Sequence, residues 1–134
     1  MTKFSLVLCT INNRKDIPKF IESLSCNIHE KKKFEVELIV IDQNTLSIAD
    51  LFSDIAERVT LKYFKVDFKG LSRARNYALK HVSGDIVCFP DDDCIYTQSL
   101  LKIFMSYLHI IIMLILSALI LRIPLQGKST GQAT

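Results

Sequence analysis

Short apolar runs alternate along this chain with longer stretches in which apolar residues recur every three or four positions. The four apolar runs, of which the third is the weakest, are 4–9, 36–41, 61–66 and 86–89. The stretches with helical spacing are 17–28, 48–59 and 71–82. Continuous apolar runs of this length are typical of strands buried on both faces, and the longer stretches are typical of amphipathic helices. The alternation therefore predicts an α/β fold, with a doubly wound, mostly parallel sheet covered by helices on both faces.

The predicted helices have recognisable ends. Asp16 is a candidate N-cap for the first helix, and Pro18 is compatible with a first helical turn. Gly70 breaks the chain before the third helix, and Ser83 with Gly84 would form the C-cap at the other end of that helix. These signals place each helix between two strands, as the fold prediction requires.

Polar side chains follow three of the four predicted strands. They are Thr10, Asn12 and Asn13 after the first, Asp42, Gln43 and Asn44 after the second, and Asp91, Asp92 and Asp93 after the fourth. In an open parallel sheet, ligands bind beyond the carboxyl ends of the strands. The sequence therefore predicts a site for a polar ligand at that edge of the sheet.

The aspartate triplet is the strongest chemical signal in the chain. Three adjacent carboxylates repel one another unless a cation joins them, and a divalent ion that prefers oxygen, Mg²⁺ or Mn²⁺, is the usual one. Asp91 and Asp93 are two positions apart and could face one ion, whereas Asp92 in an extended segment would point away. The alternative is that the triplet only caps a helix or forms a turn, and the triplet alone does not distinguish the two interpretations.

Composition narrows the functional classes. The chain has 134 residues, enough for about one domain, and its hydrophobic content of 49% excludes a disordered charged tail. Residues 1–93 contain 14 of the 17 basic residues and all 14 acidic ones, and they show no basic stripe with interleaved aromatic residues, so nothing predicts nucleic-acid binding. The four cysteines are spread singly, without a CxxC pair, which predicts a reduced, cytoplasmic environment.

Neither of the common phosphate-binding motifs is present. The sequence contains no GxxxxGK[ST] loop and no GxGxxG fingerprint. A nucleotide held without these motifs needs another positive partner for its diphosphate, and a metal ion on a carboxylate pair can provide that charge.

Four segments, taken together and in order, resemble the family 2 glycosyltransferases of the GT-A fold. They are LVLCTINNR, ELIVIDQNT, GLSRARNYAL and GDIVCFPDDD. The family pattern is a strand ending in a T-x-N turn, a strand ending in an acidic turn, G-x-x-x-ARN, and a G-[DE] strand that leads into D-x-D. The resemblance covers residues 4–104 and implies a nucleotide-diphospho-sugar-binding domain over residues 1–104, the N-terminal, donor-binding half of such an enzyme.

The resemblance also implies roles for individual residues. Those assigned to the donor are Thr10, Asn12, Asp42, Arg73, Arg75, Asn76 and Asp91. Asp91 and Asp93 would form the D-x-D motif that holds Mn²⁺ or Mg²⁺, with Asp93 as the direct ligand. Gln43 departs from the pattern, because the family usually has a second aspartate there.

Simpler interpretations of three of these residues stay open. Asn76 could face solvent, Arg73 could be a surface charge, and Asp42 could only form an Asx turn. The sequence motifs do not decide between these alternatives and the donor roles.

By this resemblance the function is metal-dependent transfer of a sugar from a nucleotide-diphosphate donor to a glycan or lipid-linked acceptor. The implied mechanism is inverting and needs a general base downstream of D-x-D. Residues 94–134 contain no Asp or Glu, so no catalytic base is identified. The second interpretation is therefore a truncated remnant that binds nucleotide but lacks the acceptor half and the base, and the isolated chain is expected to be weak or inactive. A third is an α/β binding or receiver domain unrelated to sugars.

A long apolar segment follows the aspartates. The run 103–121 has 19 residues without a charge, and at about 1.5 Å per residue it just reaches the roughly 30 Å of a bilayer core. We expect a hydrophobic C-terminal helix that contains a candidate single-pass membrane segment over 105–123, with the first domain on the cytoplasmic face, and a disordered tail over 124–134. The alternative is a replacement tail after an ordinary helix at 100–104, in a cytoplasmic protein.

Overall fold

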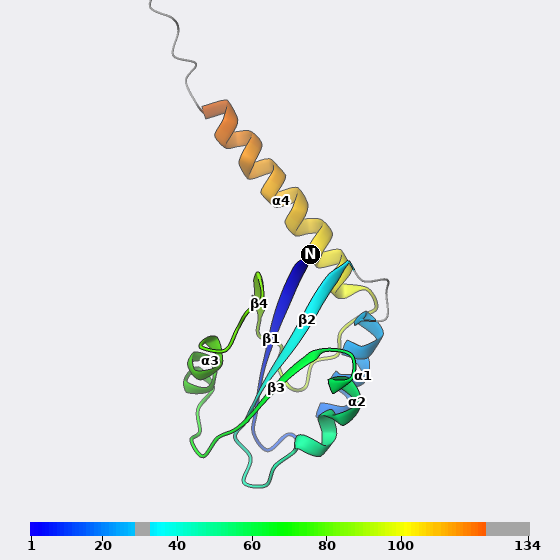
Figure 1. The fold of residues 1–134 in the computed structure, drawn as a ribbon, viewed down its shortest axis with the longest axis vertical. Coiled ribbons are helices and arrows are strands. Elements are labelled where there is room, and N and C mark those ends of the chain that lie inside the picture. Colours follow the sequence, from blue (N-terminus) through cyan, green and yellow to red (C-terminus); the bar gives the residue numbers. More distant parts are fainter. Residues whose placement is uncertain (29–32, 123–134) are drawn as a thin grey trace, which may run out of the picture. The chain divides into compact units, whose positions relative to one another are not determined.

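The computed structural model describes residues 1–28 and 33–122 (Figure 1). The chain divides after Leu100 into two units, which are described separately. The first unit contains the sheet and the helices that pack on it, and the second consists of the C-terminal helix from Leu101 onward.

The first unit is built on a four-stranded sheet. Its strands are β1 (Thr2–Thr10), β2 (Phe34–Asp42), β3 (Thr60–Lys65) and β4 (Ile86–Cys88). Their order is β3-β2-β1-β4, and all three neighbouring pairs are parallel. The two central strands are buried along most of their length, as their continuous apolar runs predict.

Helices cover both faces of this sheet. They are α1 (Ile17–Ile28), a 3₁₀ turn η1 (Ala49–Phe52), the short α2 (Ser53–Ala56) and α3 (Leu71–Leu79). Figure 1 shows α1 and α2 on one side of the sheet and α3 on the other. On the α3 side, Ala74 and Ala78 pack against Val7, Ile39 and Ile41 of the central strands. The predicted doubly wound, parallel α/β fold is confirmed.

The helix predicted over 48–59 is wrong in detail. The chain forms η1 and then a single turn of α2, not one continuous helix. The apolar residues that suggested the helix, among them Ile48, Phe52 and Ile55, are nevertheless all buried. Apolar periodicity requires only that these side chains share one face, and two short helical turns meet that requirement as well as one helix does.

Gly84 is not the C-cap that the sequence predicted. Helix α3 ends at Leu79, five residues earlier, and Gly84 lies just before β4. A Cβ atom at this position would lie 2.6 Å from Ser5 Oγ and 2.8 Å from the Lys3 carbonyl oxygen. The glycine is therefore needed because the chain passes very close to β1.

The described residues of the second unit form one long helix. Helix α4 runs from Leu100 to Arg122, and its segment Leu100–Leu119 is long and apolar enough, by length and composition, to cross a membrane. The last residue of the predicted segment 105–123 and the whole predicted tail 124–134 lie outside the described residues.

Candidate functional site

The carboxyl ends of the two central strands lie side by side. Thr10 is the register partner of Asp42, and the Gln43 backbone N–H donates to the Thr10 carbonyl at 3.0 Å. All three side chains are buried. Within the described residues, Thr10 Oγ1 and Gln43 Oε1 are the two buried side-chain oxygen atoms that have no hydrogen-bond partner. Buried polar atoms are nearly always paired, so this edge has capacity to bind a polar ligand.

The Asp42 carboxylate is already engaged by the protein. Oδ1 accepts hydrogen bonds from the Asn44 backbone N–H at 2.8 Å and from Asn44 Nδ2 at 2.7 Å. Oδ2 accepts from the Tyr63 hydroxyl and from the Ile48 N–H, the latter at 3.2 Å. Burial alone would raise the pKa of Asp42, but these hydrogen bonds outweigh it and hold the pKa below its usual value. The Asx turn considered above is therefore formed, and nucleoside binding by Asp42 stays a prediction.

Asn44 connects this carboxylate to the loop after β1. Its Oδ1 atom accepts the backbone N–H of Asn12 at 2.6 Å. Asn12 has a φ of 56°, in the left-handed region that asparagine tolerates better than most residues. The Asn12 side chain is exposed at the sheet edge. A continuous set of hydrogen bonds thus joins the ends of β1, β2 and β3 through Tyr63, Asp42 and Asn44.

The aspartate triplet forms a turn that is attached to the same edge. The Cys94 N–H donates to the Asp91 carbonyl at 3.2 Å, which closes the turn. Asn13 Nδ2 donates to Asp92 Oδ1 at 2.9 Å. The predicted extended segment is wrong, because the chain turns here, and the Asp92 side chain faces the loop after β1. That Asp92 points away from Asp91 and Asp93 stays a prediction. Asp91 and Asp93 are exposed.

Helix α3 brings one of its two predicted arginines to this turn. The Arg75 guanidinium lies 3.8 Å from Asp91 Oδ1 and 5.2 Å from the centre of the Phe89 ring. Arg73 is exposed and lies over the Phe68 ring at 4.4 Å. Asn76 is also exposed. The donor roles of Arg73 and Asn76 stay predictions, and Arg75 has the clearer structural connection to the aspartates.

Two contributors to the site were missed by the sequence analysis. Tyr63 donates to Asp42 from β3, and Cys9 lies half-buried on β1. Burial raises the pKa of Cys9 to about 11, with smaller effects from Arg75, which lowers it, and Asp92, which raises it. The Cys9 thiol is therefore neutral at pH 7. Both residues lie inside strands, where no local motif distinguishes them from core residues.

The exposed carboxylates fit a metal ion that is shared with a phosphate ligand. Across residues 1–28 and 33–122, no group of three or more His, Cys, Asp or Glu side chains forms a metal site. Mg²⁺, however, usually keeps several waters and binds one or two carboxylates together with substrate phosphates. Asp91 and Asp93 supply hard oxygen atoms that are open to solvent, so the donor set suits such an ion.

Comparison with known proteins identifies the family. The pattern of Glycosyl transferase family 2 matches residues 5–110. The chain belongs to this family. Its membership confirms the resemblance read from the four segments, and it contradicts the third interpretation, a receiver or binding domain unrelated to sugars.

One relative is similar in both sequence and structure. Poly(ribitol-phosphate) beta-N-acetylglucosaminyltransferase TarS of Staphylococcus aureus strain Mu50 is 31% identical over 104 residues, which cover 76% of this chain and 18% of TarS. The crystal structure of S. aureus TarS has a TM-score of 0.68 at 28% identity, over 80% of this chain and 19% of TarS. The chain thus spans about a fifth of the length of the curated relatives it matches.

Two further structures extend the comparison. TarS 1–349, solved in complex with UDP-GlcNAc, gives a TM-score of 0.66 at 28% identity and covers 80% of this chain and 31% of its own. The mannosyltransferase PcManGT from Pyrobaculum calidifontis, solved with GDP-Man and Mn²⁺, gives a TM-score of 0.58 at 21% identity, over 72% of this chain and 29% of its own. The second similarity is one of fold, and together they confirm the GT-A-like architecture.

Proposed function

We propose that the first unit binds a nucleotide-diphosphate sugar together with Mn²⁺ or Mg²⁺ at the carboxyl edge of the sheet. The observation that supports this most directly is the pair of buried, unpaired oxygen atoms, Thr10 Oγ1 and Gln43 Oε1, beside a turn that exposes two carboxylates. The hydrogen bond from Asn13 to Asp92 attaches that turn to the same edge. Polar groups for a nucleoside and acidic groups for a metal–diphosphate are thus available together.

The predicted residues divide into two groups in this proposal. Thr10, Asn12 and Asp42 contact or position the nucleoside, and Arg73, Arg75 and Asn76 flank the diphosphate and sugar. Asp93 and Asp91 hold the metal ion, which supplies positive charge to the diphosphate when it is bound. Arg75 adds a second positive charge from α3, because it already lies near Asp91.

Isothermal titration calorimetry with UDP-GlcNAc and UDP tests the donor site. The TarS relative was solved with both ligands, which makes them the first donors to examine. We expect binding in the presence of Mn²⁺ or Mg²⁺ and loss of binding in EDTA. Binding of equal strength in EDTA would contradict the metal-dependent site. A Glu35→Gln variant is a suitable control, because Glu35 is exposed near the start of β2, at the other end of the strand from Asp42.

For this 134-residue chain, we propose donor binding without efficient transfer to a glycan or lipid-linked acceptor. No Asp or Glu occurs after Asp93. Of the acids at the strand ends, Asp42 is occupied by four hydrogen bonds, and Asp91 and Asp93 are assigned to the metal. Using one of them as general base would therefore remove donor binding.

We further propose that α4 inserts into a membrane as a single span, with the first unit on the cytoplasmic face where nucleotide sugars are made. The segment Leu100–Leu119 is predominantly apolar, with a mean hydropathy of 2.1, and many of its large apolar side chains are exposed, for example Ile111, Met113 and Leu116. Such a helix needs an apolar environment on all sides. The charges of Lys102 and Arg122 lie near its two ends.

Membrane fractionation after an alkaline wash tests this placement. We expect the wild-type chain in the membrane pellet and an Ile111→Arg, Leu116→Arg double variant in the soluble fraction, because each central arginine costs about 2.5–3.5 kcal/mol in insertion. A Leu46→Arg variant should stay in the pellet, since Leu46 lies outside the helix. Recovery of the wild-type chain in the soluble fraction would contradict membrane insertion.

A further inference from the structure

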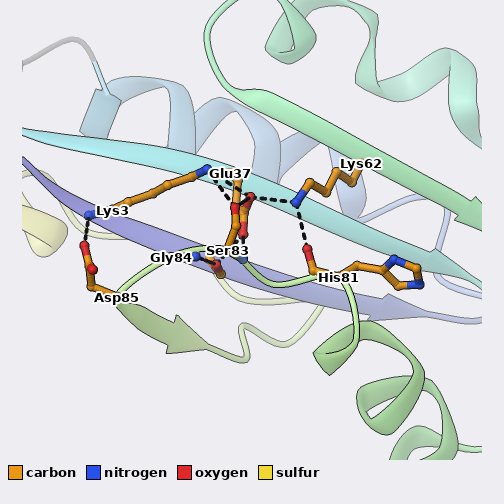
Figure 2. Close-up of polar contacts among 8 residues, drawn as sticks. Lys3, Glu37, Lys62, His81, Ser83, Gly84 and Asp85 are labelled. Atoms are coloured by element: carbon orange, nitrogen blue, oxygen red, sulfur yellow. Dashed lines mark hydrogen bonds and ion pairs between the residues drawn. The ribbon is translucent and has the colours of Figure 1, made fainter.

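A second polar cluster includes Lys3 near the start of β1 and Asp85 just before β4, and Figure 2 shows its side chains. Its centre is Glu37 on β2, which is completely buried. Oε1 accepts hydrogen bonds from the Ser5 hydroxyl and, at 2.6 Å, from the Ser83 backbone N–H. Oε2 accepts from the Ser83 hydroxyl at 2.6 Å and lies 3.2 Å from Lys3 Nζ and 3.0 Å from Lys62 Nζ.

This carboxylate is kept ionised by its surroundings. Burial alone would raise the pKa of Glu37, but hydrogen bonds from Ser5, Ser83 and Lys62 outweigh burial and hold the pKa well below the usual range. Lys3 on β1 and Lys62 on β3 contact the carboxylate, and both lysine side chains are partly exposed. A buried charge with five partners is costly to disrupt, because removal of the charge leaves several donors unsatisfied.

Several contacts in and beside this cluster fasten the segment that enters β4. Ser83 donates to Glu37 twice, and the next residue, Gly84, donates its N–H to Ser5 Oγ at 2.8 Å. Asp85 then exchanges two hydrogen bonds with Lys3, from its N–H to the Lys3 carbonyl at 2.8 Å and from the Lys3 N–H to Asp85 Oδ2 at 2.9 Å. Figure 2 shows these side chains converging between β1, β2 and the loop before β4.

The strand that follows has little else to hold it. β4 has only three residues, which pair with Phe4–Leu6 of β1, and all three are only partly buried. Five residues beyond Cys88 the chain reaches Asp93. Side-chain contacts of the three aspartates in this turn include the Asn13–Asp92 hydrogen bond and the 3.8 Å approach of Arg75 to Asp91. After the turn, the chain is held again at Tyr96, whose N–H donates to Ser23 Oγ at 3.0 Å and whose ring contacts Phe20. On the side before the turn, its position depends on how firmly β4 is fixed at its start.

We infer that Glu37 is a positioning residue for the Asp91–Asp93 turn, acting through Ser83 and β4 from the opposite end of the sheet. The inference rests on the proposed function, since it gives the turn the metal-binding role. Glu37 itself touches neither donor nor metal. Its contribution is to hold β4 at one place along β1, so that the carboxylates after β4 stay beside the ends of β1 and β2.

Amide hydrogen exchange on the full chain, with Glu37→Gln and the matched Glu35→Gln variant, tests the inference. Glu35 lies two positions away on the same strand and is exposed. We expect Glu37→Gln to speed exchange at β4 and at the Cys94 amide by at least about 10-fold while the β2 amides at Leu38–Ile41 keep their protection, as expected for local opening. Glu35→Gln should leave all of these rates unchanged.

Uniformly faster exchange across β1, β2 and β3, or no change at β4, would overturn the inference. If Glu37→Gln does not fold, Ser83→Ala replaces it. That variant removes the hydroxyl contacts of Ser83 with Glu37 and with Lys3 Nζ, and it leaves the contacts of Glu37 with Ser5, Lys3 and Lys62 in place. β4 exchange is then expected to rise about 3- to 10-fold. Unchanged exchange in that variant would equally overturn the inference.

A Mn²⁺-dependent UDP titration separates this inference from the proposed function. If the wild-type chain binds UDP, Glu37→Gln should weaken metal-dependent binding by roughly 10-fold, and unchanged affinity would overturn the positioning role. If the wild-type chain does not bind UDP at all, the proposed function fails, while the exchange data still report whether Glu37 fixes β4.

Discussion

The two edges of one parallel sheet use buried polar groups in opposite ways. At the amino side, all of the groups around Glu37 are paired, and the carboxylate has five partners. At the carboxyl side, Thr10 Oγ1 and Gln43 Oε1 are buried without a partner, and Asp91 and Asp93 face solvent. The first cluster is therefore satisfied by the fold alone, whereas the second keeps hydrogen-bonding capacity that the described protein groups do not use.

Asp42 shows that location alone does not define a role. It lies at the carboxyl edge, yet it resembles Glu37 in being fully buried and saturated with hydrogen bonds. Its pKa, like that of Glu37, lies below the usual value. Thr10 and Gln43 therefore differ from Asp42: each has a buried oxygen atom without a partner, whereas the Asp42 carboxylate is used to organise the loop after β2.

The largest expected effect concerns transfer by the chain alone. Lack of a general base typically costs roughly 10²- to 10⁴-fold in rate, and ordinary enzymes turn over at about 1 s⁻¹ or faster. We therefore expect transfer from radiolabelled UDP-GlcNAc to glycan or lipid-linked acceptors at no more than about 10⁻² s⁻¹.

Rates of order 1 s⁻¹ would show that a base is supplied from elsewhere, for instance by a second subunit. A dilution series distinguishes that case, because an intermolecular base makes the rate per chain depend on concentration. An Asp93→Asn sample measured in parallel reports any background hydrolysis that does not depend on the metal site.

Substitution within the aspartate turn should give the next largest effect. Asp93→Asn removes a charged ligand and should weaken Mn²⁺-dependent UDP binding by roughly 10- to 100-fold, or about 1.4–2.8 kcal/mol. Asp92→Asn should cost only a few-fold, because its amide oxygen can still accept the hydrogen bond from Asn13. Calorimetry on both variants measures the two losses of affinity. An equal or larger loss for Asp92→Asn would contradict the proposal that Asp93 is the main metal ligand.

At the other edge, the charge of Glu37 should make stability depend on pH. Its folded pKa lies below the ordinary value of 4.5, so between these two values the unfolded chain binds the proton. The stabilisation is complete above pH 4.5 and is lost as pH falls toward the folded pKa. Urea unfolding between about pH 5 and about pH 3 should show a steeper loss in wild type than in Glu37→Gln.

At pH 7 the same variant should cost roughly 1.5–3 kcal/mol, the range for hydrogen bonds to charged groups. Glu35→Gln, which is exposed on the same strand, should match the wild type at both pH values. Identical pH dependence in wild type and Glu37→Gln would mean that the carboxylate is not specially stabilised in the folded state.

Gly84→Ala tests how closely the chain before β4 approaches β1. The added Cβ would meet Ser5 Oγ at 2.6 Å and backbone atoms of Lys3 and Ser5 at 2.8 Å. Overpacking of this kind costs about 1–3 kcal/mol, which urea unfolding would measure. Ala substitution at Gly70, where φ is 123° but the nearest atom is 3.9 Å away, measures the cost of backbone strain without a clash. A loss of less than about 0.5 kcal/mol in Gly84→Ala would contradict the close-approach argument.

These features also show what the sequence could and could not predict. Strand and helix positions followed from apolar periodicity, since burial on one or two faces leaves a local pattern. The polar strand ends were visible because they interrupt that pattern. In contrast, the roles of Glu37, Tyr63 and Gly84 depend on contacts with residues 21 to 79 positions away. No local motif encodes such partners, so a buried glutamate and a strand tyrosine read as ordinary residues.

The smallest expected effect comes from substitution of Tyr63, which donates a hydrogen bond to Asp42 at the carboxyl edge. Its hydroxyl donates to Asp42 Oδ2 and lies 3.1 Å from the Ile48 nitrogen, while its ring contacts Phe52 with centres 5.9 Å apart. Tyr63→Phe keeps the ring and removes only the hydroxyl. It should cost about 0.5–1.5 kcal/mol, the usual net value of one hydrogen bond, because Asn44 still satisfies the other oxygen of Asp42.

The same variant should weaken UDP binding by less than about 10-fold, since the loop of residues 43–48 loses one of several anchors. Tyr77→Phe is the matched control: Tyr77 packs against Phe64 and Phe68 through its ring, so its loss of a hydroxyl should change neither stability nor affinity appreciably. Urea unfolding and calorimetry on both variants test the comparison. A loss of UDP affinity of 100-fold or more in Tyr63→Phe would mean that Asp42 binds the nucleoside directly and requires Tyr63 to do so, whereas a smaller loss is what a loop-organising Asp42 predicts.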